Sequence, residues 1–272
     1  MDDNPFLTGL IALANYSMQF SRVERITFHP DGVRPETDSD HTVMLQLLAT
    51  TAAIELNGAE PEVWDLPLLD VPKVTRFALV HDLVEGYAGD TPSYRIDDAA
   101  AEEKDAREAR ALARIEHRFH DVASWMVDAI KAYEAQEVPE ARFVRLMDKM
   151  LPKVTHTLNY GVTVRHQGDD AEGLREALTL QRAKLLAEYP EFEQLFVLLF
   201  DDLADRAVAA MGGPLEGDEA IDNTKEWVED GFREAERRMA VLQQVCPARP
   251  GTGWGISMNG RLTEYLTSTE ES

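Results

Sequence analysis

The segment from residue 74 to residue 90, VTRFALVHDLVEGYAGD, carries three ionisable side chains where an apolar stripe should continue. His81, Asp82 and Glu85 extend the three-and-four spacing of the apolar residues before them, which places them on or beside the buried face of one helix. Burying an unpaired carboxylate is costly, so a folded protein neutralises it, pairs it or binds a metal ion with it. Because a metal ion satisfies histidine and aspartate together, the segment indicates metal chemistry.

Two other segments each place one polar side chain beside apolar neighbours. His41 shares a helical face with three apolar residues, and Asp148 lies on an apolar line in a later helix. Taken alone, His41 could be a hydrogen-bonded core histidine, and Asp148 beside Lys149 could belong to a solvated face. The joint pattern over three helices favours a metal site. Imidazole and carboxylate ligands together suit Mn, Fe, Co, Ni or Zn.

The elements that must position these side chains are helices. Apolar residues recur at three-and-four spacing almost from end to end, and no alternating strand-like run stands out, so the predicted fold class is all-α. A glycine and proline cluster beginning at Gly212 is the clearest linker, which divides the chain into a compact domain over 1–210 and a C-terminal helix and tail over 211–272. Helices are expected near 5–22, 39–57, 71–87, 97–119, 121–135, 139–160, 170–188, 191–210 and 217–245.

The composition restricts the classes of partner and compartment. The 272 residues include 27 Lys and Arg against 50 Asp and Glu, and the net charge of −23 disfavours nucleic acid and anionic membranes as partners. A single cysteine, Cys246, excludes an intramolecular disulfide framework and a four-thiolate zinc site, which fits a cytoplasmic protein. The first twenty residues lack a basic region and contain polar interruptions, so we expect a folded helix there and no signal peptide or membrane span.

The order His, His-Asp and distant Asp resembles the HD-domain phosphohydrolase superfamily. The strings RPETDSDH, HDLVEGYAGDTPS and PEARFVRLMDK are similar to the branch of 5′-deoxynucleotidases and to phage deoxynucleotide triphosphohydrolases, over about residues 6–160. The resemblance implies an HD-domain helical bundle with a C-terminal helical extension. It also implies one divalent metal ion, held by His41, His81, Asp82 and Asp148.

The same resemblance implies roles for three further residues. Glu85 would act in acid and base catalysis, and Asp90 would line the site for the sugar and the phosphate. Arg25 matches an early arginine that binds phosphate, although Ile26 stands here where that family has tryptophan. Without the resemblance, the simpler interpretations are a helix-end carboxylate for Glu85, a turn-forming side chain for Asp90 and a surface ion pair for Arg25.

The predicted function is a metal-dependent phosphohydrolase of nucleotide metabolism, acting on deoxynucleoside 5′-monophosphates. A deoxynucleoside triphosphate triphosphohydrolase is the close alternative. A di-iron oxygenase of the HD type would need His117 and His120 as ligands to a second metal, and a non-catalytic helical protein would keep the metal only for structure. A guanosine tetraphosphate hydrolase is disfavoured, because Gly86 stands where that group has a second acid. The expected partners are a small nucleotide and a second copy of the chain.

Overall fold

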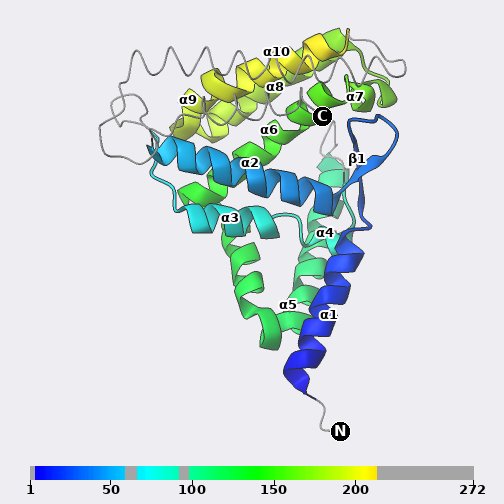
Figure 1. The fold of residues 1–272 in the computed structure, drawn as a ribbon, viewed down its shortest axis with the longest axis vertical. Helices are drawn as coiled ribbons and strands as arrows, with labels where there is room; N and C mark the ends of the chain where they lie inside the picture. The colour runs from blue at the N-terminus through cyan, green and yellow to red at the C-terminus, as the bar shows by residue number, and fades with distance from the viewer. Residues whose placement is uncertain (1–3, 59–65, 92–97, 213–272) are drawn as a thin grey trace, which may run out of the picture. The chain divides into compact units, whose positions relative to one another are not determined.

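The computed structural model describes residues 4–58, 66–91 and 98–212 (Figure 1). This part of the chain is mostly helical, which confirms the predicted all-α class. The helix predicted over 217–245 and the tail after it lie outside the described residues, and the division at 210/211 stays a prediction. Within the described ranges, no helix is both long and apolar enough to span a membrane.

Within the described residues, the elements form a long helical series that one small hairpin interrupts. They are α1 (Pro5–Phe20), β1 (Glu24–Phe28), β2 (Pro35–Thr37), α2 (Asp38–Gly58), α3 (Val71–Val80), α4 (Glu85–Ala88), α5 (Asp98–Ala135), α6 (Pro139–Leu158), α7 (Val162–His166), α8 (Ala171–Glu188), the 3-10 turn η1 (Pro190–Phe192), α9 (Glu193–Leu195), the π-helical turn η2 (Phe196–Phe200) and α10 (Asp201–Ala210).

The hairpin of β1 and β2 was not predicted from the sequence. The two strands pair antiparallel, with Glu24 opposite Thr37 and Phe28 opposite Pro35, and the register shifts between those pairs. Strands of five and three residues are too short to give a clear alternating pattern. The hairpin matters because β1 carries Arg25 and β2 runs directly into α2.

The helix predicted over 71–87 divides into α3 and α4, which are separated by a turn at 81–84. The backbone bonds there span three residues, from Leu83 N–H to the Val80 carbonyl and from Glu85 N–H to the Asp82 carbonyl. Adjacent residues do not face the same way on a regular helix. The turn therefore lets His81 and the residue after it both reach one point.

An unexpected contact from α1 holds this turn. The Tyr16 hydroxyl donates a hydrogen bond to the Leu83 carbonyl, and a Cβ atom at Gly86 would lie only 2.8 Å from that hydroxyl oxygen. Gly86 is therefore required for the close approach of Tyr16. A larger side chain at this position would push α1 away from the turn.

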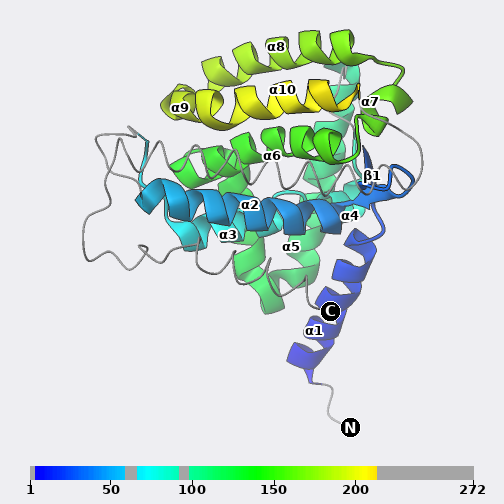
Figure 2. The ribbon, with the colours of Figure 1, turned by 45° about the horizontal axis from the view of Figure 1, so that its top comes forward.

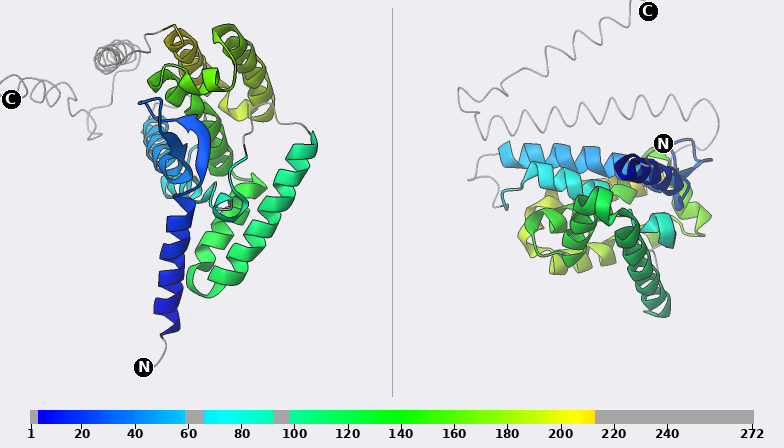
Figure 3. Two further views of the ribbon diagram at one scale, coloured as in Figure 1. Left: turned by 90° about the vertical axis from the view of Figure 1, so that its right-hand side faces the viewer. Right: turned by 90° about the horizontal axis from the view of Figure 1, so that it is seen from below.

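The helices predicted at 97–119 and 121–135 form the continuous element α5, which reverses direction at Ala123 (Figure 3). The backbone there leaves the helical region, with φ −146° and ψ 48°. The helix predicted over 191–210 starts with two short turns and the π-helical turn η2 before α10 begins. Figure 2 shows α10 lying between α8 and α6, and it packs on both.

Three apolar clusters form the core of the described residues. The largest joins α2, α3 and α6 with residues 192–200, the second joins α1, α4 and α5, and a small one lies under α7, α8 and α10. Phe77 and Ala78 belong to the first cluster, whereas Val80 and Val84 belong to the second. The turn at 81–84 thus follows the point where the chain passes from one cluster to the other.

Candidate metal centre

Four of the predicted site residues converge from three separate parts of the fold. His41 comes from α2, His81 and Asp82 come from the turn after α3, and one ligand atom from each lies within 4.8 Å of the others. Asp148 from α6 places its Oδ1 atom 2.9 Å from His41 Nε2 and 4.0 Å from His81 Nε2. These side chains could hold one divalent metal ion.

The two imidazoles are oriented by groups behind them. The Nδ1–H group of His81 donates to the Ala78 carbonyl at 2.9 Å, so in the neutral ring Nε2 carries a lone pair toward the cluster. Asp82 Oδ2 lies 2.9 Å from this Nε2, yet the geometry forms no hydrogen bond, and Nε2 is buried without a hydrogen-bond partner. A buried, unsatisfied imidazole nitrogen beside carboxylates fits a metal ligand.

His41 is oriented in the same way by a carboxylate that sequence reasoning missed. Its Nδ1 atom lies 3.4 Å from Oε1 of Glu36, a buried residue of β2, and Thr27 donates a hydrogen bond to the other carboxylate oxygen. Burial lowers the pKa of His41, but hydrogen bonds to Asp148 and Glu36 raise it to about 9. Glu36 belongs to the string RPETDSDH, so the resemblance of that string was the signal that could have identified it.

Arg25 lies at the centre of a group of carboxylates. Its Nη1 atom is 2.8 Å from Asp82 Oδ2, 3.1 Å from Asp38 Oδ1 and 3.7 Å from Glu85 Oε2. The structure therefore places Arg25 beside the predicted metal ligands and not in a surface ion pair. Asp38 is fully buried and was also missed, although it belongs to the same string as Glu36.

The carboxylates of this centre differ in their preferred protonation. Burial and the neighbouring Asp82 and Asp38 raise the pKa of Glu85 to about 11, and Glu85 Oε2 is buried without a hydrogen-bond partner. Burial also raises the pKa of Asp148, but Lys149, at 2.8 Å, and His41 more than offset this and hold it well below its usual range. Glu85 thus favours a proton, whereas Asp148 favours the charged form.

Asp90 lies at the edge of this centre. Burial raises its pKa, Arg25 lowers it and Asp82 raises it again, so Asp90 is within electrostatic reach of the cluster. Lys104 of α5 is a second cation that sequence reasoning did not select. Burial lowers its pKa, but Glu108, Glu85 and Asp82 together raise it, which places Lys104 in the field of the same carboxylates.

The histidines needed for a second metal lie elsewhere. His117 and His120 are both exposed on α5, and neither belongs to a ligand cluster within the described part of the chain. The di-iron alternative therefore gains no support from the described residues. His29, which had no supporting pattern in the sequence, contacts Asp40 at 3.1 Å outside the cluster.

A helical bundle that gathers a histidine, a histidine-aspartate pair and a distant aspartate at one point offers a divalent metal ion a set of imidazole and carboxylate ligands. The chain matches the family model of the HD domain over residues 19–189, and it therefore belongs to the HD-domain family. This match confirms the predicted superfamily. Membership in it also supports the prediction of a metal-dependent hydrolase. The specific branch is not distinguished.

Several solved structures have a similar fold. One of them is the crystal structure of a predicted metal-dependent phosphohydrolase from Magnetospirillum magnetotacticum MS-1, with a TM-score of 0.55 and 24% sequence identity. The match covers 75% of this chain and 96% of that chain. No curated protein sequence matches the chain.

Proposed function

We propose that the protein is a metal-dependent phosphohydrolase that removes the phosphate of deoxynucleoside 5′-monophosphates. The observation that carries this proposal is the convergence of His41, His81 and Asp82 within 4.8 Å, with Asp148 in contact with His41 and a buried Glu85 beside them. The HD-domain membership and the similarity to a predicted metal-dependent phosphohydrolase support the same class of reaction.

In this proposal, His41, His81, Asp82 and Asp148 are the ligands of one divalent ion, drawn from Mn, Co, Zn, Fe and Ni. The unsatisfied Nε2 atom of His81 and the mixed imidazole and carboxylate donors fit such an ion. When bound, the metal polarises a phosphoryl oxygen and lowers the pKa of water. Glu36 and the Ala78 carbonyl hold the two imidazole rings in the required orientation.

Glu85 is proposed as the acid that protonates the leaving oxygen. Burial raises the pKa of Glu85, which favours the protonated carboxyl group, and Oε2 of Glu85 lies 3.7 Å from Arg25 Nη1 at the centre. Departure of the sugar oxygen is easier once it is protonated. Asp90, at the edge of the same centre, is proposed to line the sugar and phosphate site.

Arg25 is proposed to bind the phosphate. All of its three carboxylate contacts are made by Nη1, which leaves the other guanidinium donors to face a phosphoryl oxygen. The next residue, Ile26, is exposed on β1 and is smaller than the tryptophan of the resembled branch. We therefore propose only a weak preference for deoxyribose over ribose.

A triphosphohydrolase is the second candidate, and the cations around the centre favour it. Lys149 contacts Asp148 at 2.8 Å, and Lys104 lies in the field of Glu85 and Asp82. Added to Arg25, these side chains reduce the repulsion that a net charge of −23 exerts on a triphosphate.

The test is release of phosphate from a panel of ribo- and deoxynucleoside mono- and triphosphates, assayed with each of the five metals and with EDTA. Inorganic phosphate released from deoxynucleoside monophosphates in a metal-dependent reaction supports the proposal. Intact tripolyphosphate from a triphosphate, with no activity on any monophosphate, selects the second candidate. Hydrolysis that persists in Asp148→Asn at the wild-type rate would contradict both.

A further inference from the structure

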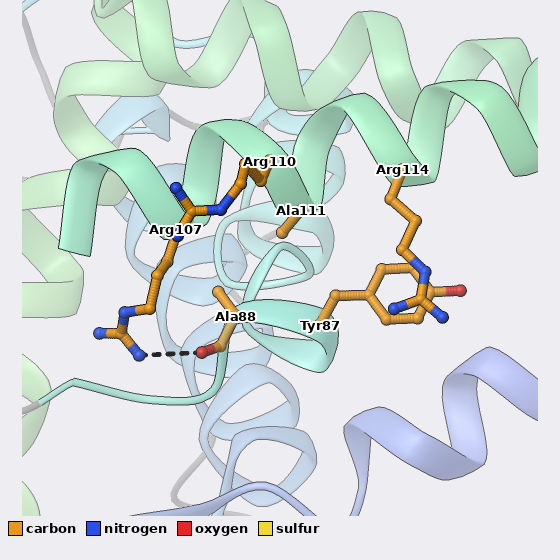
Figure 4. A pocket seen from close by; sticks show the side chains of 6 residues that line it. All are labelled: Tyr87, Ala88, Arg107, Arg110, Ala111 and Arg114. Atoms are coloured by element: carbon orange, nitrogen blue, oxygen red, sulfur yellow. Dashed lines mark hydrogen bonds between the residues drawn. The ribbon is translucent and has the colours of Figure 1, made fainter. Parts of the chain in front are cut away.

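A pocket of about 230 Å³ lies beside α4, on residues that take no part in the candidate metal centre. Its wall consists of three arginines and an alanine from α5 together with two residues of α4: Arg107, Arg110, Ala111, Arg114, Tyr87 and Ala88 (Figure 4). Its lining shares no residue with the ligand clusters of the described chain. It is therefore a distinct feature of the molecule.

The charge of this pocket is opposite to that of the chain as a whole. Among the described side chains, none of its three arginines forms an ion pair with a carboxylate, in a protein whose net charge is −23. Arg110 and Arg114 are also four residues apart on one helix, where like charges destabilise the helix. Three arginines on one helix without an ion-pair partner among the described side chains are an arrangement that an anionic ligand would stabilise.

Two of the arginines are already held in place. Arg107 Nη1 donates to the Ala88 carbonyl at 3.0 Å (Figure 4). Its Nη2 donates to the Thr91 hydroxyl. The Arg114 guanidinium lies 3.9 Å from the centre of the Tyr87 ring. Stacking on an aromatic face leaves the in-plane N–H groups of a guanidinium free to donate to other acceptors.

Unused hydrogen-bonding groups surround the same wall. The Nε atom of Arg107 and the hydroxyl of Tyr87 are buried without a hydrogen-bond partner. Arg110 is exposed, and it forms no hydrogen bond, ion pair or ring contact with the described residues. Buried donors are normally satisfied, so these groups are consistent with a ligand that supplies acceptor oxygens.

The spacing of the arginines sets the size of that ligand. Arg107 and Arg114 are seven residues apart, which corresponds to about 10 Å along the axis of α5. One phosphate group is too small to bridge that length, whereas two linked phosphate groups can contact neighbouring arginines in succession. We propose that this arginine pocket binds a small anion with at least two linked phosphates, either inorganic pyrophosphate or the diphosphate of a nucleotide.

The test is isothermal titration of the full-length, metal-free protein with pyrophosphate in the presence of EDTA. Without metal, the carboxylates around Arg25 repel an anion from the other centre, so binding there does not obscure the result. We expect saturable binding with one site per chain. Since charge-assisted hydrogen bonds are lost, Arg110→Gln and Arg114→Gln should each raise Kd by about tenfold or more.

Arg118→Gln is the matched control, because Arg118 is an exposed arginine of α5 outside the pocket, and its Kd should equal that of the wild type. Arg110→Gln removes no hydrogen bond, ion pair or ring contact to the described residues, so an unchanged melting temperature beside a loss of binding separates the ligand contact from a folding defect. Absence of saturable binding, an equal loss in Arg118→Gln, or equal affinities for phosphate and pyrophosphate would overturn the proposal. Titration with ADP then distinguishes the two sources of the diphosphate group. If ADP binds at least tenfold more tightly than pyrophosphate and Arg110→Gln weakens that binding, the ligand is a nucleotide. If ADP and pyrophosphate bind equally, the ligand is an inorganic polyphosphate. Because no metal or turnover is involved, failure here leaves the proposed hydrolase function untouched.

Discussion

Among the charged side chains that helix α6 buries, Asp148 and Lys153 have surroundings that are opposite in kind. Asp148 faces ionic partners, with Lys149 at 2.8 Å and the imidazole of His41 at 2.9 Å. Lys153 faces neutral oxygens, the Lys149 carbonyl at 2.7 Å and Gln181 Oε1 at 2.6 Å, with the Phe200 ring 4.4 Å away.

This difference shows in the protonation of the two groups. The ionic neighbours of Asp148 overcome its burial and hold its pKa well below the usual range. Burial and the nearby Lys149 lower the pKa of Lys153 to about 7, because neutral hydrogen-bond partners do not replace the lost hydration of an ammonium group. A buried charge kept by compensating charges is suited to chemistry, whereas a buried charge without them costs stability.

The largest expected effect comes from removing a side chain of the candidate metal centre that contains Asp148. His41→Ala, Asp82→Ala and Asp148→Asn should each lose bound metal and nearly all hydrolysis, because the remaining ligands no longer fix the geometry of the ion. Metal content by atomic emission and phosphate release measure the two losses. Asp128→Asn is the control, since Asp128 is exposed on α5. Wild-type metal content in all three variants would remove the ligand assignment.

Glu85→Gln tests the proton carried by the centre and should have the next largest effect. Glutamine keeps the size of the side chain but cannot transfer a proton, so kcat should fall on the order of 10²-fold or more while the metal stays bound. Steady-state kinetics with metal analysis measure both. Glu116→Gln serves as the control, because Glu116 forms an exposed ion pair with Lys131 away from the centre. A wild-type kcat in Glu85→Gln would show that Glu85 has only a structural role.

Arg25→Gln should weaken substrate binding and leave the metal in place. The loss of charge-assisted hydrogen bonds to phosphate predicts a rise in KM of about tenfold. The same change leaves Asp38 and Glu85 without their cation, which further raises their preference for protons. Arg34→Gln, an exposed arginine on the β1–β2 connection, should behave as the wild type. An equal rise in KM in both variants would mean that only net charge matters.

Lys153→Met tests the neutral surroundings of Lys153 through the stability of the protein. The metal content should stay unchanged. Burial lowers the pKa of Lys153 to about 7 in the folded protein, against 10.5 for an ordinary lysine side chain. Between these values the unfolded chain binds more protons, so this lysine makes stability rise with pH across that window. Relative to the wild type, Lys153→Met should therefore gain stability as pH falls from 10.5 to 7, by about 5 kcal/mol over the whole window and about 3 kcal/mol of it below pH 9.5.

Urea unfolding of both proteins at pH 6.5 and pH 9.5 measures this difference. The comparison between pH values is independent of the fixed loss of the bond to Gln181. Lys184→Met on α8 is the control, because Lys184 is exposed and should give the same difference from wild type at both pH values. A pH-independent difference for Lys153→Met would show that the ammonium group is compensated in the folded protein.

Much of the fold was predictable because helical periodicity is local. The helices near 5–22, 39–57, 139–160 and 170–188 were placed within about two residues of the observed ends. The hairpin was missed because its strands are short, and the helix over 71–87 was overextended because nothing in its apolar pattern shows the turn at 81–84. The reversal at Ala123 lies inside the helix predicted over 121–135, because apolar periodicity does not show where the chain changes direction.

The sequence by itself determined which residues were available for chemistry. The spacing of His81, Asp82 and Glu85 against the apolar stripe, and the isolated His41 and Asp148, selected five side chains that the structure places in one region. Spacing along a helix could do this because a polar residue on a buried face must find a partner. The net charge also followed from composition alone.

Only the tertiary structure decided which partners those residues have. Arg25 meets Asp82 across 57 positions of sequence, His41 meets Asp148 across 107, and Lys153 meets Gln181 across 28. Glu36 and Asp38 became part of the centre because the hairpin folds back onto α2, and the arginine pocket exists because α5 packs on α4. Such contacts depend on how distant elements pack, and the pKa of each buried group follows from its final neighbours, which no local pattern specifies.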